Sequence, residues 1–131
     1  MPGTKPLAQP SRPLLDLVLR QNGVDPTQPL LYRISIGERR FYIGKARTAA
    51  RPLNDYRRNL QRMVEGRPYR RQKPERFRPV HRAMHAALQQ DELVVIDLLG
   101  NYPLDRLGPA EKRAIAEYRA RYGREAVLNA T

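Results

Sequence analysis

Alternating apolar and polar side chains predict a β-hairpin across residues 30–45. Between Leu30 and Ile36 the alternation has a period of two, and the later run Phe41-Tyr42-Ile43 is aromatic and β-branched. Gly37 and the charged residues after it separate the two runs, a composition typical of a hairpin connection. This stretch therefore predicts two antiparallel strands joined by a short turn.

The register of this hairpin decides where its two tyrosines lie. Tyr32 and Tyr42 share a face only if even-numbered positions pair with even-numbered ones, for example Ile36 with Arg40 across a three-residue connection. A shared face places both hydroxyls near the Gly44-Lys45 step, where backbone amides and an ammonium can approach an anion. The alternative is an aromatic cross-strand pair that only packs on a core.

The remaining periodicity predicts one further strand and four helices. Apolar residues recur at helical spacing in 52–65, 79–90 and 109–122, and each of these stretches begins with a proline. The nearly continuous apolar run 93–99 is typical of a strand covered on both faces. A shorter helix is expected from about residue 13 to Arg20, with Gly23 as its stop.

These elements divide the chain into three parts. Residues 1–13 are rich in proline and poor in apolar side chains, so we expect a flexible tail. Residues 14–29 form the N-terminal helix and a turn, and residues 30–131 form the main domain. At 131 residues in total, one domain with a modest core is expected.

Composition narrows the kind of partner. The formal net charge is +12, from 25 Lys and Arg against 13 acids, which favours nucleic acid over a membrane because no strong apolar face opposes the charges. The absence of cysteine fits a cytoplasmic protein, and no apolar run is long enough to span a membrane. The alternative is a soluble basic protein without such a partner.

At the hairpin the chain resembles the GIY-YIG nuclease superfamily. Tyr42-Ile43-Gly44 matches the second motif of that family, whereas Leu30-Leu31-Tyr32 keeps only the tyrosine of the first. The resemblance covers about residues 30–131. It implies an α/β (α+β) fold in which a small three-stranded mixed sheet, the hairpin plus one central strand, is flanked by helices, here with an extra N-terminal helix. It also implies a DNA endonuclease that depends on Mg²⁺ or Mn²⁺.

Phosphodiester hydrolysis needs a carboxylate for such a metal, and Glu111 is the candidate. On the last predicted helix it shares a stripe with Ile115, Tyr118 and Tyr122 and therefore points toward the sheet, unlike Glu117. The resemblance implies that Glu111 is the metal ligand. The alternative is a helix-start carboxylate, because with Pro109 first in the helix Glu111 is third.

The candidate cations for binding the phosphate lie at the end of the hairpin and directly after it. Arg51 lies seven residues after Gly44 and Tyr56 five after Arg51; the family places its arginine one residue later. Because Pro52 is expected to begin the helix, Arg51 is predicted at or before its cap. Arg47 is the substitute for Arg51, and Lys45 matches a phosphate-binding lysine of many members.

The tyrosines and a late asparagine complete the resemblance. Tyr32 is expected to act as the base, assisted by Tyr56, while Tyr42 positions water or phosphate. For this role the pKa of a tyrosine must fall, which a metal ion or the neighbouring cations can cause. Asn129 resembles the family's late asparagine and is assigned to phosphate binding.

The segment from Arg57 to Arg82 is strongly basic and reads as a surface for the nucleic-acid backbone. It holds ten Lys or Arg against two Glu, interleaved with Tyr69 and Phe77. Its phosphate-binding candidates are Arg57, Arg70, Arg71 and Lys73. His81 and His85, four apart on a helix, are predicted on the arginine-bearing face, where phosphate or solvent contacts are favoured over a metal site.

Two other functions stay open. The first is a catalytically inactive, basic nucleic-acid-binding module on the same fold, which the missing Gly-Ile of the first motif and the displaced Arg51 favour. The second is a structural RNA-binding protein without nuclease ancestry. Cleavage of a plasmid that EDTA abolishes separates the nuclease from both.

Overall fold

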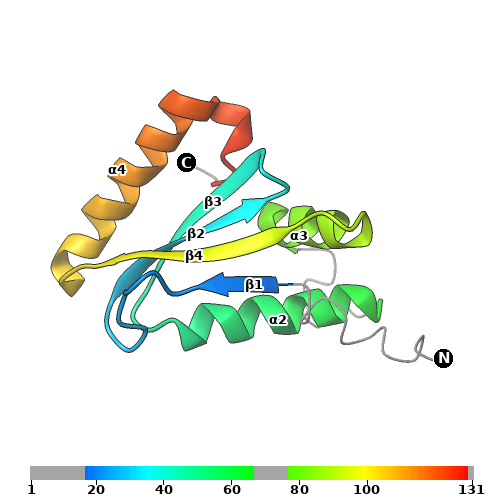
Figure 1. Ribbon diagram of the computed structural model, residues 1–131, viewed down its shortest axis with the longest axis horizontal. Helices are drawn as coiled ribbons and strands as arrows, with labels where there is room; N and C mark the ends of the chain where they lie inside the picture. Colours follow the sequence, from blue (N-terminus) through cyan, green and yellow to red (C-terminus); the bar gives the residue numbers. More distant parts are fainter. Residues whose placement is uncertain (1–16, 67–76, 130–131) are drawn as a thin grey trace.

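The computed structural model describes residues 17–66 and 77–129, which form an α+β fold with one mixed sheet (Figure 1). Its strands are β1 (Leu17–Arg20), β2 (Leu30–Ile36), β3 (Arg40–Ala46) and β4 (Val94–Asn101). Its helices are α2 (Ala50–Val64), α3 (Pro79–Gln89) and α4 (Leu104–Tyr122), and a 3-10 turn η2 (Arg124–Ala126) follows α4. The predicted tail, 1–13, lies outside the described residues.

The sheet contains four strands in the order β1-β4-β2-β3, not the three that the sequence predicts. β2 pairs antiparallel with both β3 and β4, and β1 pairs parallel with β4. The fourth strand is Leu17–Arg20, which was predicted as the end of a helix. A short apolar run is ambiguous between the two structures, and here the free edge of β4 supplies a hydrogen-bonding partner that local sequence does not reveal.

The hairpin register is the one that the shared-face prediction requires. Ile36 pairs with Arg40, Ile34 with Tyr42 and Tyr32 with Gly44, so even-numbered positions lie opposite even-numbered ones. The turn between them uses positive φ at Gly37 and Glu38, 63° and 77°. Tyr32 and Tyr42 therefore project from the same face of the sheet.

Helices cover both faces of the sheet. On one face, α2 and α3 close the main core, in which Tyr32, Ile34, Tyr56 and Met84 are buried together. On the other face, α4 packs over β2 and β3, away from α2 and α3 (Figure 1). α2 and α3 begin and end within two residues of their predicted bounds. In the described part of the chain, no helix combines the length and apolar character needed to cross a membrane.

α4 begins five residues before its predicted start, at Leu104, so Pro109 lies inside the helix. Leu107 and Ala110 pack against Leu31 on β2. We infer that this burial offsets the backbone hydrogen bond that a proline inside a helix cannot donate.

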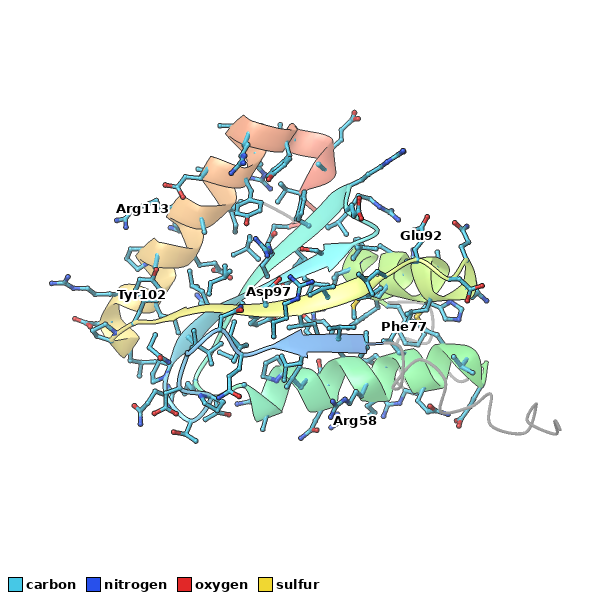
Figure 2. The ribbon with its side chains drawn as sticks, viewed as in Figure 1. Arg58, Phe77, Glu92, Asp97, Tyr102 and Arg113 are labelled. Carbon is cyan, nitrogen blue, oxygen red and sulfur yellow. The ribbon has the colours of Figure 1, made fainter. Side chains whose placement is uncertain are left out.

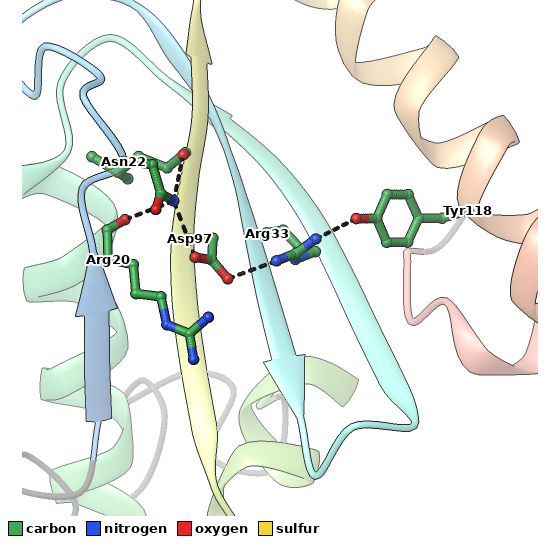
Figure 3. A network of polar contacts seen from close by, with 6 residues as sticks. Arg20, Asn22, Arg33, Asp97 and Tyr118 are labelled. Atoms are coloured by element: carbon green, nitrogen blue, oxygen red, sulfur yellow. Dashed lines mark hydrogen bonds and ion pairs between the residues drawn. The ribbon is translucent and has the colours of Figure 1, made fainter.

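A polar network ties α4 to three strands on the face opposite the main core (Figure 3). The Arg33 guanidinium donates to the Asp97 carboxylate at 2.7 Å and to the Tyr118 hydroxyl. Asn22, just after β1, donates to the other oxygen of Asp97 at 3.0 Å. Burial alone raises the pKa of Asp97, but the hydrogen bonds from Asn22 and Arg33 outweigh it, so the pKa lies below its usual value.

Candidate active site

A pocket of about 550 Å³ opens between the hairpin and the start of α2. The hairpin contributes Tyr32, α2 contributes Tyr56, and the residue that caps α3, Arg78, completes the wall. Around these three side chains the lining is Lys45, Ala46, Arg47, Arg51, Pro52, Asp55 and Arg58. Five cations and one carboxylate among the lining residues make this a strongly positive pocket.

Two tyrosine hydroxyls meet at the pocket wall. The Tyr32 and Tyr56 oxygens lie 2.8 Å apart, and the two rings are edge to face with centroids 6.1 Å apart. One hydroxyl must donate and the other accept, so the accepting tyrosine keeps its own proton for a pocket ligand. Both side chains are buried, which fixes this pair in place.

Burial changes the ionisation of this pair in the direction opposite to the one predicted. It raises the pKa of Tyr32 well above its usual value, and the nearby Tyr56 hydroxyl adds to the rise. It also raises the pKa of Tyr56 to about 12. The charge of Arg78 does lower the pKa of Tyr32, but the loss of water around a phenolate outweighs it, so the protein alone does not show the fall in pKa that the role of a base requires.

Tyr42 joins the pocket through Arg78. The Arg78 Nη1 donates to the Tyr42 hydroxyl at 3.1 Å, and its guanidinium carbon lies 5.7 Å and 5.6 Å from the ring centres of Tyr42 and Tyr56. The backbone N–H of Arg78 donates to His81 Nδ1 at 3.2 Å, which holds the start of α3. Three tyrosines and one arginine thus form a single cluster.

His81 does not lie on the exposed, arginine-bearing face where the sequence placed it. It is fully buried, edge to face with Tyr56 at 5.6 Å between centroids. Burial and the charge of Arg78 lower the pKa of His81 to about 4. The imidazole is therefore neutral at neutral pH, as its acceptor role requires. The prediction failed because α3 buries a wider face, including Ala83, than the apolar stripe indicated.

The predicted cations Lys45, Arg47 and Arg51 all line the pocket, and all three are exposed. Arg51 is the second residue of α2 and not a residue at or before its cap, because the helix begins two residues earlier than predicted. The first turn of α2 carries no acid, although acids are the residues that stabilise a helix N-terminus. The positive end of the helix and Arg51 therefore add to one another at the pocket.

Glu111 faces the sheet, as predicted, and contacts the lining residue Lys45, but it does not itself line the pocket. Its side chain is 20% exposed, and Oε1 is 3.6 Å from Lys45 Nζ, a contact that joins α4 to β3. Glu111 is the eighth residue of α4 and not the third. The alternative of a helix-start carboxylate is therefore wrong. Glu117 is exposed, as predicted.

Of the other predicted phosphate-binding residues, two lie elsewhere and three fall outside the described part of the chain. The Asn129 amide accepts from the Ile43 N–H at 3.0 Å and donates to the Ile43 carbonyl at 2.7 Å, so it fastens the chain to β3. Arg57 is exposed on α2 and is not a lining residue. Arg70, Arg71 and Lys73 fall outside the described residues, as does Tyr69.

Arg78 and Asp55 line the pocket but were not singled out as site residues in the sequence. Arg78 stands directly before Pro79 at a helix start, where Ser, Thr, Asp or Asn is the usual cap. That unusual residue choice was the available signal. Asp55 pairs with Arg58 at 3.6 Å along α2, on whose outer side Figure 2 shows Arg58.

The described residues around the pocket do not form a closed metal cage. Within the described ranges, no group of three or more His, Cys, Asp or Glu side chains is placed to hold an ion. Mg²⁺, however, commonly binds through one or two carboxylates, substrate phosphates and water. The ion pair of Glu111 is longer than a hydrogen bond, so its oxygens keep lone pairs for such an ion.

No family model, curated protein or solved structure matches this chain.

Proposed function

We propose that this protein is a divalent-metal-dependent endonuclease of the GIY-YIG type that hydrolyses phosphodiester bonds in DNA. The observation that carries the proposal is the meeting of Tyr32, Tyr56, Lys45 and Arg51 at one positive pocket, with Glu111 beside Lys45. These are the residues that the motif resemblance selected from separate parts of the sequence. Their convergence is what a shared catalytic role requires.

In this proposal the cations bind the scissile phosphate. Lys45, Arg47 and Arg51 neutralise its non-bridging oxygens, and the N-terminus of α2 adds its dipole. The Tyr32–Tyr56 pair is neutral at neutral pH and donates its remaining hydrogen bond to a phosphate oxygen. Glu111 holds Mg²⁺ or Mn²⁺, which when bound polarises the phosphate and neutralises charge on the leaving oxygen.

The alternative is a catalytically inactive DNA-binding module with the same pocket. Two observations favour it: burial raises the pKa of Tyr56 to about 12, which removes an easily formed base, and Glu111 already pairs with Lys45. This module binds DNA with a strong salt dependence but leaves it uncut.

Cleavage of supercoiled plasmid in Mg²⁺, with EDTA as the control, tests the proposal. The nuclease hypothesis expects cleavage that EDTA abolishes and that Glu111→Gln lowers by orders of magnitude. Because Lys45 is half exposed, loss of its ion pair should cost little stability. Glu117→Gln makes the same chemical change on an exposed position of α4 and should cleave normally.

DNA binding by Glu111→Gln should persist or tighten, because a negative charge has left a phosphate site. No cleavage by the wild-type protein, together with intact salt-sensitive binding, establishes the inactive module. Normal cleavage by Glu111→Gln would refute the assignment of Glu111 as the metal ligand.

A further inference from the structure

Arg78 is a half-buried cation whose described partners are all neutral. Its guanidinium lies against the rings of Tyr42 and Tyr56, and it donates to the Tyr42 hydroxyl. Among residues 17–66 and 77–129, no carboxylate forms an ion pair with it. Asp55, the acid that lines the same pocket, pairs instead with Arg58.

Such an arrangement favours an anion. Removing a guanidinium from water costs free energy that two phenol rings offset only in part, through cation–π contacts of about 0.5–2 kcal/mol. Exposed cations such as Arg47 and Arg51 do not carry this cost, because water still surrounds them. An anion that enters the pocket therefore gains more from Arg78 than from an equally distant surface arginine.

The geometry holds Arg78 ready for this contact. Its backbone is anchored by the hydrogen bond to His81 Nδ1, and Pro79 keeps it in an extended conformation at the helix cap, with φ −69° and ψ 156°. One guanidinium N–H is used by Tyr42, and the planar group has others in a fixed fork. A phosphate is the anion whose oxygens match such a fork.

We infer that Arg78 is a phosphate-binding residue of this pocket, additional to Lys45, Arg47 and Arg51, and that it holds the DNA backbone against the tyrosine cluster. The inference deepens the proposed function and rests on it for the identity of the anion as a DNA phosphate. It assigns to the cap of α3 a direct contact with substrate.

Binding of a short DNA duplex in EDTA, where no metal-dependent cleavage can interfere, tests the inference. Arg78→Gln should weaken binding about tenfold and make the slope of log affinity against log salt shallower by about one. Arg78→Lys should keep the slope, because the charge remains, and lose part of the affinity, because the fork is gone. Arg113→Gln, at an exposed position of α4 outside the basic segment 57–82, is the matched control.

A second measurement uses inorganic phosphate alone. At matched ionic strength, phosphate should raise the melting temperature of the wild-type protein above its value in chloride, and Arg78→Gln should lose this difference. If Arg78 acts only through its ring contacts, Arg78→Gln should lower the melting temperature equally in phosphate and in chloride. Unchanged affinity, slope and phosphate response in Arg78→Gln overturn the inference.

The outcomes separate this inference from the proposed function. If the wild-type protein leaves plasmid uncut but binds DNA and phosphate through Arg78, the nuclease proposal fails and the phosphate site stands. If the wild-type protein cuts plasmid while Arg78→Gln behaves like Arg113→Gln in both binding tests, the nuclease stands and Arg78 is only structural.

Discussion

Gly44 lies directly under the ring of Tyr32, its partner across the hairpin. A Cβ on Gly44 would stand 2.2 Å from Tyr32 Cζ and 2.3 Å from its hydroxyl oxygen, closer than atoms can approach. The Tyr32 ring also meets Tyr56 edge to face and shares a hydrogen bond with its hydroxyl. Glycine is therefore required at this position so that the tyrosine pair can form.

Gly44→Ala should displace the Tyr32 ring and break its hydrogen bond to Tyr56. We expect a loss of about 1–3 kcal/mol in the free energy of unfolding, typical of an overpacked core, and a loss of plasmid cleavage if the nuclease proposal holds. Urea unfolding measures the first. Gly100→Ala is the control, because its Cβ would meet Tyr102 at an ordinary 3.4 Å. Equal effects of the two substitutions would argue against the steric role of Gly44.

The tyrosine pair also predicts a loss of stability in alkali. The pKa of Tyr56 is about 12 in the folded protein against 10.0 for a free tyrosine, so the unfolded chain loses its proton first. Stability is therefore full below pH 10 and declines between about pH 10 and 12, by roughly 2–3 kcal/mol from this group. The free energy of unfolding, measured at a series of pH values across this range, should change less with pH for Tyr56→Phe than for the wild-type protein.

Prediction from sequence succeeded for elements whose apolar residues repeat regularly along one buried face. The helices α2 and α3 follow their apolar spacing, and the hairpin register follows from the alternation around Tyr32 and Tyr42. It failed for β1, because pairing with β4 depends on a strand more than seventy residues away. It also failed for the start of α4, where packing of Leu107 against Leu31 overrides the usual place of a proline.

The residues of the candidate site were likewise predicted only in part. Spacing relative to the motif glycine found Lys45, Arg47 and Arg51, because the chain runs directly from β3 into α2. Arg78 enters the pocket from an element far along the chain, so no local spacing marks it. The raised pKa of Tyr32 depends on how completely water is excluded, which a list of residues does not specify.

Because His81 is buried and neutral, we expect the stability of the fold to decrease in acid. Its pKa is about 4 in the folded protein against 6.5 for a free histidine, so the unfolded chain binds the proton first as pH falls. The contribution to stability is complete above pH 6.5 and is lost progressively toward pH 4, by up to roughly 3 kcal/mol. His81→Asn keeps an acceptor but does not titrate, so its stability should fall less than that of the wild-type protein over this range. An unchanged pH slope in His81→Asn would contradict the assignment.

The network around Asp97 makes a separate prediction for stability alone. Asp97→Asn removes the carboxylate that Arg33 contacts at 2.7 Å and should lower the free energy of unfolding by about 2–3 kcal/mol at neutral pH, less than for a fully buried pair because Arg33 is 26% exposed. The difference should shrink in acid, below the lowered pKa of Asp97, since the wild-type carboxyl is then protonated as well. Asp105→Asn, on the exposed first turn of α4, is the control.

DNA affinity should be the same for folded Asp97→Asn and the wild-type protein. Asp97 lies on the sheet face under α4, whereas the pocket opens on the face of α2 and α3. A change in affinity would show that the two faces are coupled.

The position of β4 between β1 and β2 fixes the order in which the sheet is completed during synthesis. The hairpin of β2 and β3 forms from neighbouring residues, but β1 has no partner until residues 94–97 have left the ribosome. Until then the nascent chain leaves β1 without its partner β4 and leaves the edge of β2 that β4 will cover open to other chains. The last strand to be made is thus the one that covers the facing edges of β1 and β2.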